Sequence, residues 1–126
     1  MRIVYDSGAL IAIGKRSERM LRIHRRVLAE RAVPIVPTIV LGQVWRGVPR
    51  EAALARALKV CLPHALDVTT AKLGGQLCGV AGTSDLADAV VAVLALRYDA
   101  PIFTSEPDDL RRLVEAAGRT LEIFAV

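Results

Sequence analysis

Short apolar runs alternate with longer helical patterns along the whole chain, and this alternation constrains the fold more than any other feature. The first run is β-branched or aromatic and predicts a buried strand. Strands are predicted at residues 3–5, 33–36, 62–68, 100–103 and 121–125. Helices are predicted at residues 9–13, 17–31, 38–45, 51–60, 70–80, 85–97 and 107–118. We therefore predict one α/β domain over residues 1–126, with a mostly parallel sheet and helices on both faces.

Proline, threonine and glycine add detail to these elements. Pro34 lies inside the second predicted strand, which indicates the start of a strand or the edge of the sheet. Thr38 is the predicted N-cap of the third helix. Gly74, Gly75 and Gly79 lie inside a predicted helix, where each costs about 1 kcal/mol relative to alanine. Close packing against another helix is the expected reason for all three.

The charge of the chain is concentrated in one predicted helix. The net charge is +4, and 53% of the residues are hydrophobic, which is enough for a substantial core. Residues 15–31 hold seven basic and two acidic residues, so this segment carries +5 and the remainder sums to −1. The longest apolar run, residues 89–96, is too short for a membrane span. With two cysteines and no basic leader before an apolar stretch, a reduced, cytoplasmic protein is expected.

Acidic residues follow two of the predicted strands and begin the most apolar helix. Asp6 follows the first strand, and Asp85 and Asp88 begin the helix at residues 85–97. Three further acids follow the fourth strand, namely Glu106, Asp108 and Asp109. In parallel α/β sheets, ligands bind at the carboxyl ends of strands. The alternative interpretation, that Asp6, Asp85 and Asp88 cap or begin helices, stays open and is compatible with a site.

Clustered carboxylates would need a cation. Two of them about 4 Å apart repel by about 4 kcal/mol at an effective dielectric of 20, and oxygen ligands with water suit Mg²⁺ or Mn²⁺. The histidines and cysteines show no spacing typical of a zinc site. Neither a Walker phosphate loop nor a serine-hydrolase elbow is present.

Four segments carry a resemblance to a known family. They read VYDS at residues 4–7, VPTIVLGQVWR at 36–46, TSDLADA at 83–89 and FTSEPDDL at 103–110. In this order and spacing, over nearly the whole chain, they resemble the PIN domain family and its VapC-type toxins of toxin–antitoxin pairs. The resemblance implies a PIN-like doubly wound α/β/α sandwich with about five mostly parallel strands, and Mg²⁺- or Mn²⁺-dependent cleavage of RNA.

The resemblance also implies the residues of an acidic metal site. Asp6 and Asp88 match two family aspartates, and Asp85 matches a further acid that is often present. Glu106 stands where the family usually has aspartate, which keeps the charge and adds one methylene. Gln43 stands where the family usually has glutamate, so a charge is lost and a carbonyl oxygen is kept. Because an unpaired buried amide is costly, Gln43 is expected to point at the acids.

The implied mechanism is the attack of a metal-bound water on the RNA phosphate. Thr104 or Ser105 would hydrogen-bond the substrate or a ligating carboxylate, although capping of the next helix is the favoured role for Ser105. Arg46, Arg50 and the basic helix would follow the RNA backbone or form a solvated face. The expected partners are RNA, a cognate antitoxin and a second copy of the chain, through residues 11–28 and the helix around Trp45.

Two other function classes fit parts of the pattern. One is an RNA-binding module that keeps the fold and has lost catalysis, because the family glutamate is replaced by Gln43. The other is a receiver-like phospho-acceptor domain, which would need paired acids after the first strand and a lysine after a late strand. Arg2 and Tyr5 are not acids, and no lysine follows Phe103, so the receiver pattern is not met.

Overall fold

The centre of the protein is a five-stranded, all-parallel sheet with strand order β3-β2-β1-β4-β5. The computed structural model describes residues 1–126. The strands are β1 Arg2–Tyr5, β2 Val33–Pro37, β3 Leu62–His64, β4 Ile102–Thr104 and β5 Ile123–Ala125. The chain builds outward from β1 in one direction through β2 and β3, and then returns to build β4 and β5 on the other side. The strand order therefore reverses between β1 and β4, which is where ligands bind in open α/β sheets.

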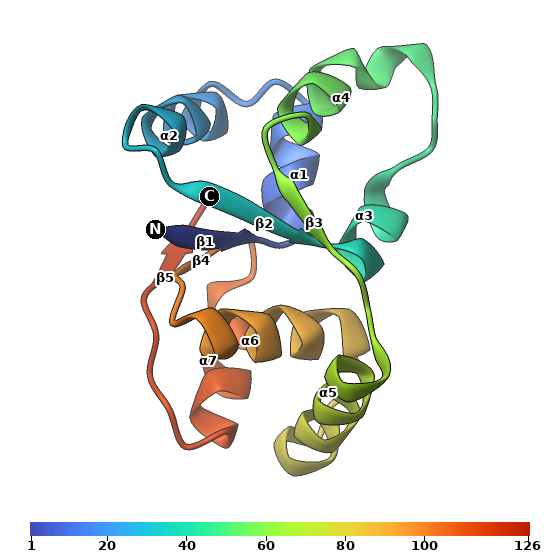
Figure 1. Cartoon of the computed structure of the whole chain (residues 1–126), viewed down its shortest axis with the longest axis vertical. Coiled ribbons are helices and arrows are strands. Elements are labelled where there is room, and N and C mark those ends of the chain that lie inside the picture. The colour runs from blue at the N-terminus through green and yellow to red at the C-terminus, as the bar shows by residue number, and fades with distance from the viewer.

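Helices cover both faces of this sheet (Figure 1). They are α1 Ser7–Gly14, α2 Glu18–Ala29, α3 Thr38–Val44, the 3₁₀ turn η1 Pro49–Glu51, α4 Ala52–Leu58, α5 Val68–Ala81, α6 Leu86–Tyr98 and α7 Pro107–Ala116. Figure 1 shows α1, α2 and α4 on one face and α5, α6 and α7 on the other. The predicted doubly wound, PIN-like α/β/α sandwich is confirmed as a fold.

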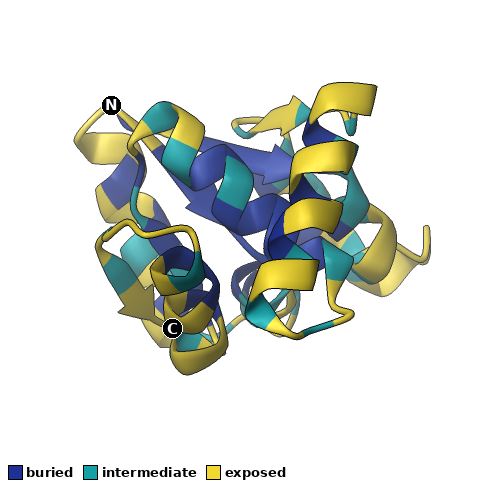
Figure 2. Cartoon of the chain, turned by 90° about the horizontal axis from the view of Figure 1, so that it is seen from below, coloured by how far each residue is buried: buried dark blue, intermediate teal, exposed yellow.

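The core lies between the sheet and the inner faces of the helices (Figure 2). Ile3, Val4 and Tyr5 of β1 are fully buried, as expected for the central strand of a parallel sheet. Helix α6 buries seven of its thirteen residues, which explains its apolar composition. The Tyr5 hydroxyl satisfies its hydrogen-bonding need with Nδ1 of His24 in α2, at 2.9 Å. No single helix has the length and apolar character of a membrane span.

The structure decides one open alternative among the predicted elements and shows two other details to be wrong. Strand β2 is an interior strand, so Pro34 marks its start and not a sheet edge. Thr38 does not cap α3: the N-cap position is Pro37, and the Thr38 hydroxyl accepts the backbone N–H of Leu66 at 3.2 Å. The third strand ends at residue 64, because the carboxylate of Asp67 caps α5 by accepting the N–H of Thr70 at 2.7 Å.

Close helix packing explains one of the three glycines of α5. A Cβ at Gly74 would lie 3.1 Å from Cγ2 of Val90 and 3.2 Å from Cδ1 of Leu86, so α5 packs tightly on α6 there. A Cβ at Gly75 or Gly79 would meet no atom within 4 Å. The packing explanation is therefore wrong for Gly75 and Gly79, which lie on the exposed side of α5.

Candidate active site at the carboxyl edge of the sheet

Asp6 lies where the chain leaves β1, at the reversal of the strand order. Its side chain is 2% exposed. One carboxylate oxygen accepts the backbone N–H of Ala9 at 3.0 Å, so Asp6 is the N-cap of α1. The other oxygen accepts the hydroxyl of Thr104 at the end of β4. Asp6 therefore both caps a helix and lies among polar groups at the strand ends, so the two interpretations of this residue do not exclude each other.

Thr104 links the two strand ends that flank the reversal point. It is fully buried, and its hydroxyl donates to Asp6 while the same oxygen accepts the backbone N–H of Glu106 at 2.8 Å. The backbone N–H of Asp6 also donates to the carbonyl of Phe103 at 3.2 Å. These bonds hold the Asp6 carboxylate in one position relative to β4.

The pKa of Asp6 is raised above the ordinary value for an aspartate. Burial is the largest cause, because it removes water from the charged form. The Thr104 hydroxyl and the N–H groups of Ala9 and Gly8 lower the pKa, and the nearby charge of Glu106 raises it. The Thr104 hydroxyl is thus one of the groups that favour the ionised form of this buried carboxylate.

Replacing Thr104 by valine should destabilise the protein by about 1–3 kcal/mol, because two buried polar groups lose their partner while the side-chain shape is kept. The pKa of Asp6 should rise further, since the hydroxyl that lowers it is gone. Denaturant unfolding at pH 7 measures the first effect. If Thr104→Val unfolds at the same midpoint as the unaltered protein, the hydroxyl does not hold the two strand ends together.

Asp85 and Asp88 begin α6 and face the same region. Asp85 is the N-cap of α6 and accepts the backbone N–H of Asp88 at 3.0 Å, so the capping interpretation of Asp85 is confirmed. Asp88 is half-buried, and its pKa is raised to about 7. Burial is the largest cause, followed by the charges of Asp85, Asp6 and Asp109. We call Asp6, Asp85, Asp88 and Asp109 the acidic cluster.

Asp109 is the member of the acidic cluster that sequence reasoning did not assign to the site. It lies in the first turn of α7, and a hollow of about 120 Å³ is lined by Asp85, Asp88, Asp109 and Arg112. The ion pairs of the protein within 4 Å join Arg26 to Glu30 and Arg111 to Asp108, so none neutralises the acidic cluster. The only sequence signal was the run of acids after β4, which did not show which of them turns toward α6.

The other residues predicted for the site include Glu106, Ser105 and Gln43, and all three are exposed. Glu106 is exposed and acts on Asp6 through its charge. Ser105 is exposed and does not cap α7, because the N-cap position is Glu106 and makes no side-chain bond. Gln43 is also exposed, and no hydrogen bond of its side chain is present within the protein. The cost of a buried amide therefore gives no reason for Gln43 to face the acids, and its role in the site stays a prediction.

The two arginines predicted to contact substrate are exposed and are not bonded to the acidic cluster. The Arg46 guanidinium donates to the carbonyl of Trp45 at 2.9 Å, at the end of α3. The backbone N–H of Arg46 donates to the carboxylate of Glu51 at 2.9 Å. Arg50 lies in the 3₁₀ turn that follows. A contact of either arginine with RNA stays a prediction.

The donor chemistry of the acidic cluster fits a hard divalent cation. All its side chains offer carboxylate oxygens, and the pKa of Asp88 is raised first by burial and then by the charges of the other three members. No three acidic, histidine or cysteine side chains are grouped closely enough to hold one ion entirely by protein ligands. Mg²⁺ commonly binds through one or two carboxylates and keeps several waters. A closed protein cage is therefore excluded at this cluster, and a metal ion held partly by water stays a prediction.

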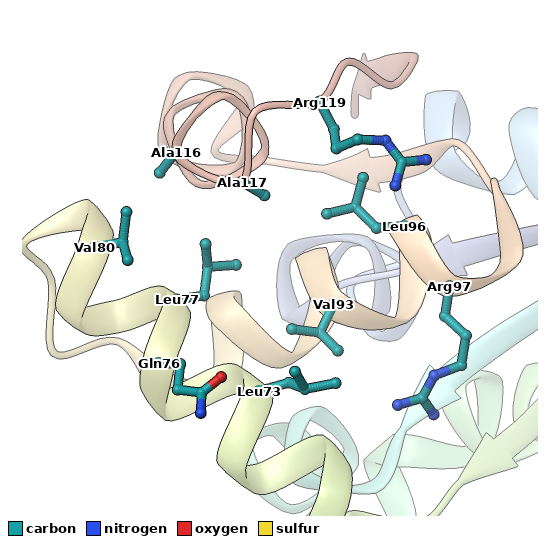
Figure 3. Close-up of a pocket in the computed structure, with 10 residues that line it drawn as sticks. All are labelled: Leu73, Gln76, Leu77, Val80, Val93, Leu96, Arg97, Ala116, Ala117 and Arg119. Atoms are coloured by element: carbon teal, nitrogen blue, oxygen red, sulfur yellow. The ribbon is translucent and has the colours of Figure 1, made fainter.

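A second hollow, of about 400 Å³, lies between α5, α6 and α7 (Figure 3). Leu73, Leu77, Val80 and Val93 line it, and Arg97 lies at its rim. It contains no acid, histidine or nucleophile. It therefore offers no groups for general acid–base or metal chemistry, and the acidic cluster remains the candidate active site.

Comparison with known proteins gives a fold and no family. No family model matches the chain, and no curated protein matches it. The crystal structure of VapBC2 from Rickettsia felis bound to a promoter DNA fragment is similar over 100% of this chain and 99% of that chain, with a TM-score of 0.70 and 15% identity. The structure of FitAB bound to the IR36 DNA fragment is similar over 99% and 94%, with a TM-score of 0.63 and 16% identity.

These findings correct the family assignment made from the four sequence segments. The chain is not identified as a PIN-family, VapC-type toxin, because no family model matches and the similar chains come from VapBC2 and FitAB complexes and are only 15% and 16% identical. Likeness at that level shows the fold alone. The physical reason for the error is that short apolar strands followed by acidic helix starts arise from the fold itself, so their order does not prove common membership.

Proposed function

We propose that the protein is a metal-dependent endoribonuclease that hydrolyses RNA phosphodiester bonds at the acidic cluster. The observation that carries the proposal is the grouping of Asp6, Asp85, Asp88 and Asp109 near the reversal of the strand order, where burial and the neighbouring charges raise the pKa of Asp88 to about 7. Clustered carboxylates at the reversal of a parallel sheet support metal chemistry on an anionic substrate. The fold likeness to toxin–antitoxin assemblies supports a nuclease role more than other roles of α/β sheets.

Asp6 and Asp88 would hold Mg²⁺ or Mn²⁺, with Asp85, Asp109 and Glu106 in reach through water. The bound ion would acidify a water molecule for attack on phosphorus and stabilise charge on the phosphoryl oxygens. Two hydrogen bonds within the chain hold the proposed metal ligands in position. Thr104 fixes the Asp6 carboxylate by donating a hydrogen bond, and Asp85 fixes the first turn of α6, which carries Asp88.

A second candidate function is RNA binding without catalysis. Two observations favour it: Gln43 is neutral, and no three ligands are grouped around one point. The two functions differ in one measurable property, since only the nuclease cleaves RNA faster when Mg²⁺ or Mn²⁺ is added.

The proposal includes a cognate protein partner, as in a toxin–antitoxin pair, and a homodimer. It is supported by the fold likeness to VapBC2 and FitAB complexes. It is also supported by exposed apolar side chains on the predicted surfaces, namely Ile11, Leu28 and Trp45. Between α1, α2 and α4 there is a hollow of about 390 Å³, lined by Ile13, Leu21 and other apolar side chains, which offers room for a partner segment.

Cleavage of RNA by the purified protein should depend on Mg²⁺ or Mn²⁺ and stop in EDTA. Asp6→Asn should lower the cleavage rate at least about 100-fold, because one of the two proposed metal ligands loses its charge. Asp67→Asn is the matched control, since Asp67 is also an aspartate N-cap but lies outside the acidic cluster. Cleavage that survives EDTA, or equal losses in the two variants, would contradict the proposal.

A further inference from the structure

A row of aromatic side chains crosses the sheet on its α2 face. The strand register pairs Tyr5 with Phe103 and Phe103 with Phe124, so the three rings project from the same face of β1, β4 and β5. The ring centroids are 6.0 Å and 5.1 Å apart. The bond from Tyr5 to His24 shows that this face is the one covered by α2. The outermost ring, Phe124 on the edge strand, is 42% exposed.

One arginine of α2 reaches the strand that carries this exposed ring, and two more lie on the same flank of the helix. Arg19, Arg22 and Arg26 are spaced i, i+3 and i+7, so they share one flank of the helix, and all are exposed. The Arg19 guanidinium donates to the carbonyl of Ala125, the residue after Phe124, at 3.1 Å. Figure 1 shows the C-terminal end of the chain turned toward α2. At 1.5 Å per residue the three arginines cover about 10 Å.

The same strand end connects this surface to the acidic cluster. Ala125 pairs with Thr104, and the backbone N–H of Val126 donates to the Thr104 carbonyl at 2.9 Å. The Thr104 hydroxyl donates to Asp6. Because neighbouring strands are about 4.8 Å apart, the carbonyl that Arg19 binds lies roughly 10 Å from the end of β1.

We infer that Arg19, Arg22, Arg26 and Phe124 form a track for single-stranded RNA that leads to the acidic cluster. The inference rests on the proposed function for the identity of the substrate. Single strands present phosphates to guanidinium groups and unpaired base faces to an aromatic ring, and this surface offers both. A duplex would use the arginines but not the ring, because its bases are stacked. An acidic polypeptide would also leave the ring without a partner.

The track is tested by binding in EDTA, where cleavage is blocked. The probe is a fluorescently labelled 12-nucleotide uridine RNA, measured by anisotropy at several salt concentrations. Phe124→Leu keeps an apolar side chain against Phe103 and should weaken binding at least about five-fold, through lost stacking. Arg22→Gln should weaken binding and reduce the slope of log affinity against log salt by about 0.7. Lys72→Gln, an exposed charge loss on α5, is the matched control and should change neither quantity.

Four results would overturn the track. One is equal weakening by Arg22→Gln and Lys72→Gln, which would show a general charge effect. Another is an unchanged affinity in Phe124→Leu with a normal melting temperature. The third is equal sensitivity of single-stranded and duplex RNA to Phe124→Leu, which would show that the ring does not stack on bases. Binding of polyglutamate as tight as that of RNA would likewise assign the surface to an acidic protein.

Failure of the track and failure of the proposed function give different results. If RNA is bound through the track but Mg²⁺ never stimulates cleavage, the nuclease proposal fails and the track stands. If cleavage depends on Asp6 while Phe124→Leu and Arg22→Gln leave both binding and KM unchanged, the track fails and the nuclease stands. If both hold, the two track variants should raise KM and leave kcat nearly unchanged, because they act on substrate away from the reacting phosphate.

Discussion

Asp88→Asn is expected to abolish metal-dependent RNA cleavage, by at least about 100-fold, and to stabilise the metal-free protein at pH 8. The two effects have one cause. Asp88 carries a charge that the proposed metal needs and that the metal-free fold tolerates poorly, because burial and the charges of Asp85, Asp6 and Asp109 oppose its ionisation. Asparagine keeps the size of the side chain and removes the charge.

The sign of the pH dependence follows from the raised pKa. Asp88 binds its proton more tightly in the folded protein, up to about pH 7, than in the unfolded chain, where aspartate titrates near pH 4. Its contribution to stability is therefore fully present below about pH 4 and is lost as pH rises to about 7. Because Asp88 is only half-buried, solvent screening reduces the loss to about 1–2 kcal/mol. Asp88→Asn should remove this part of the pH dependence.

Denaturant unfolding in EDTA at pH 4.5, 6 and 8 measures the effect, with Asp99→Asn as the control at the opposite end of α6. The stability gained by Asp88→Asn should grow between pH 4.5 and pH 8, and it should grow more than that of Asp99→Asn, which lies outside the acidic cluster. Added Mg²⁺ should raise the melting temperature of the unaltered protein and leave that of Asp88→Asn nearly unchanged. Parallel pH profiles for all three proteins would show that Asp88 does not lie among facing carboxylates.

Local signals in the sequence were sufficient for the elements. The apolar run of β1 and the position of Pro107 at the start of α7 each have a physical cause within a few residues. The alternation of strands and helices then led to a parallel sheet covered on both faces, which the structure confirms. The third strand was predicted too long, because Asp67, which caps α5, was counted as part of it.

The site was predicted less completely, because it depends on contacts between distant segments. Asp109 is one of three acids after β4, and only the packing of α7 beside α6 shows that it faces Asp88. Gln43 was expected to point at the acids because a buried, unpaired amide is costly, but its side chain is exposed. The aromatic row was missed altogether, since Tyr5, Phe103 and Phe124 meet only through the strand register.

Gly8→Ala is expected to destabilise the protein by about 1–3 kcal/mol or more and to lower RNA cleavage together with stability. Gly8 lies in the first turn of α1, where a Cβ would be 2.6 Å from Cβ and 2.8 Å from the backbone nitrogen of Ser105. The second of these atoms belongs to the chain that follows β4, so it cannot move like the end of a flexible side chain. The first turn of α1 would have to separate from β4, and Asp6, which bonds both Ala9 and Thr104, could no longer keep both partners.

Glycines at which an added Cβ would meet no neighbouring atom provide the matched control for Gly8→Ala. At Gly75 and Gly79 the same substitution meets no atom within 4 Å, inside a helix, so alanine should stabilise by about 0.5–1 kcal/mol. The change from glycine to alanine should therefore destabilise the protein at Gly8 and stabilise it at Gly75 and Gly79. Adding Ser105→Gly to Gly8→Ala removes the serine side-chain atoms and leaves the backbone nitrogen, so part of the lost stability should return. If Gly8→Ala unfolds like the unaltered protein, or if Ser105→Gly recovers nothing, the close approach of α1 to β4 does not hold Asp6 in place.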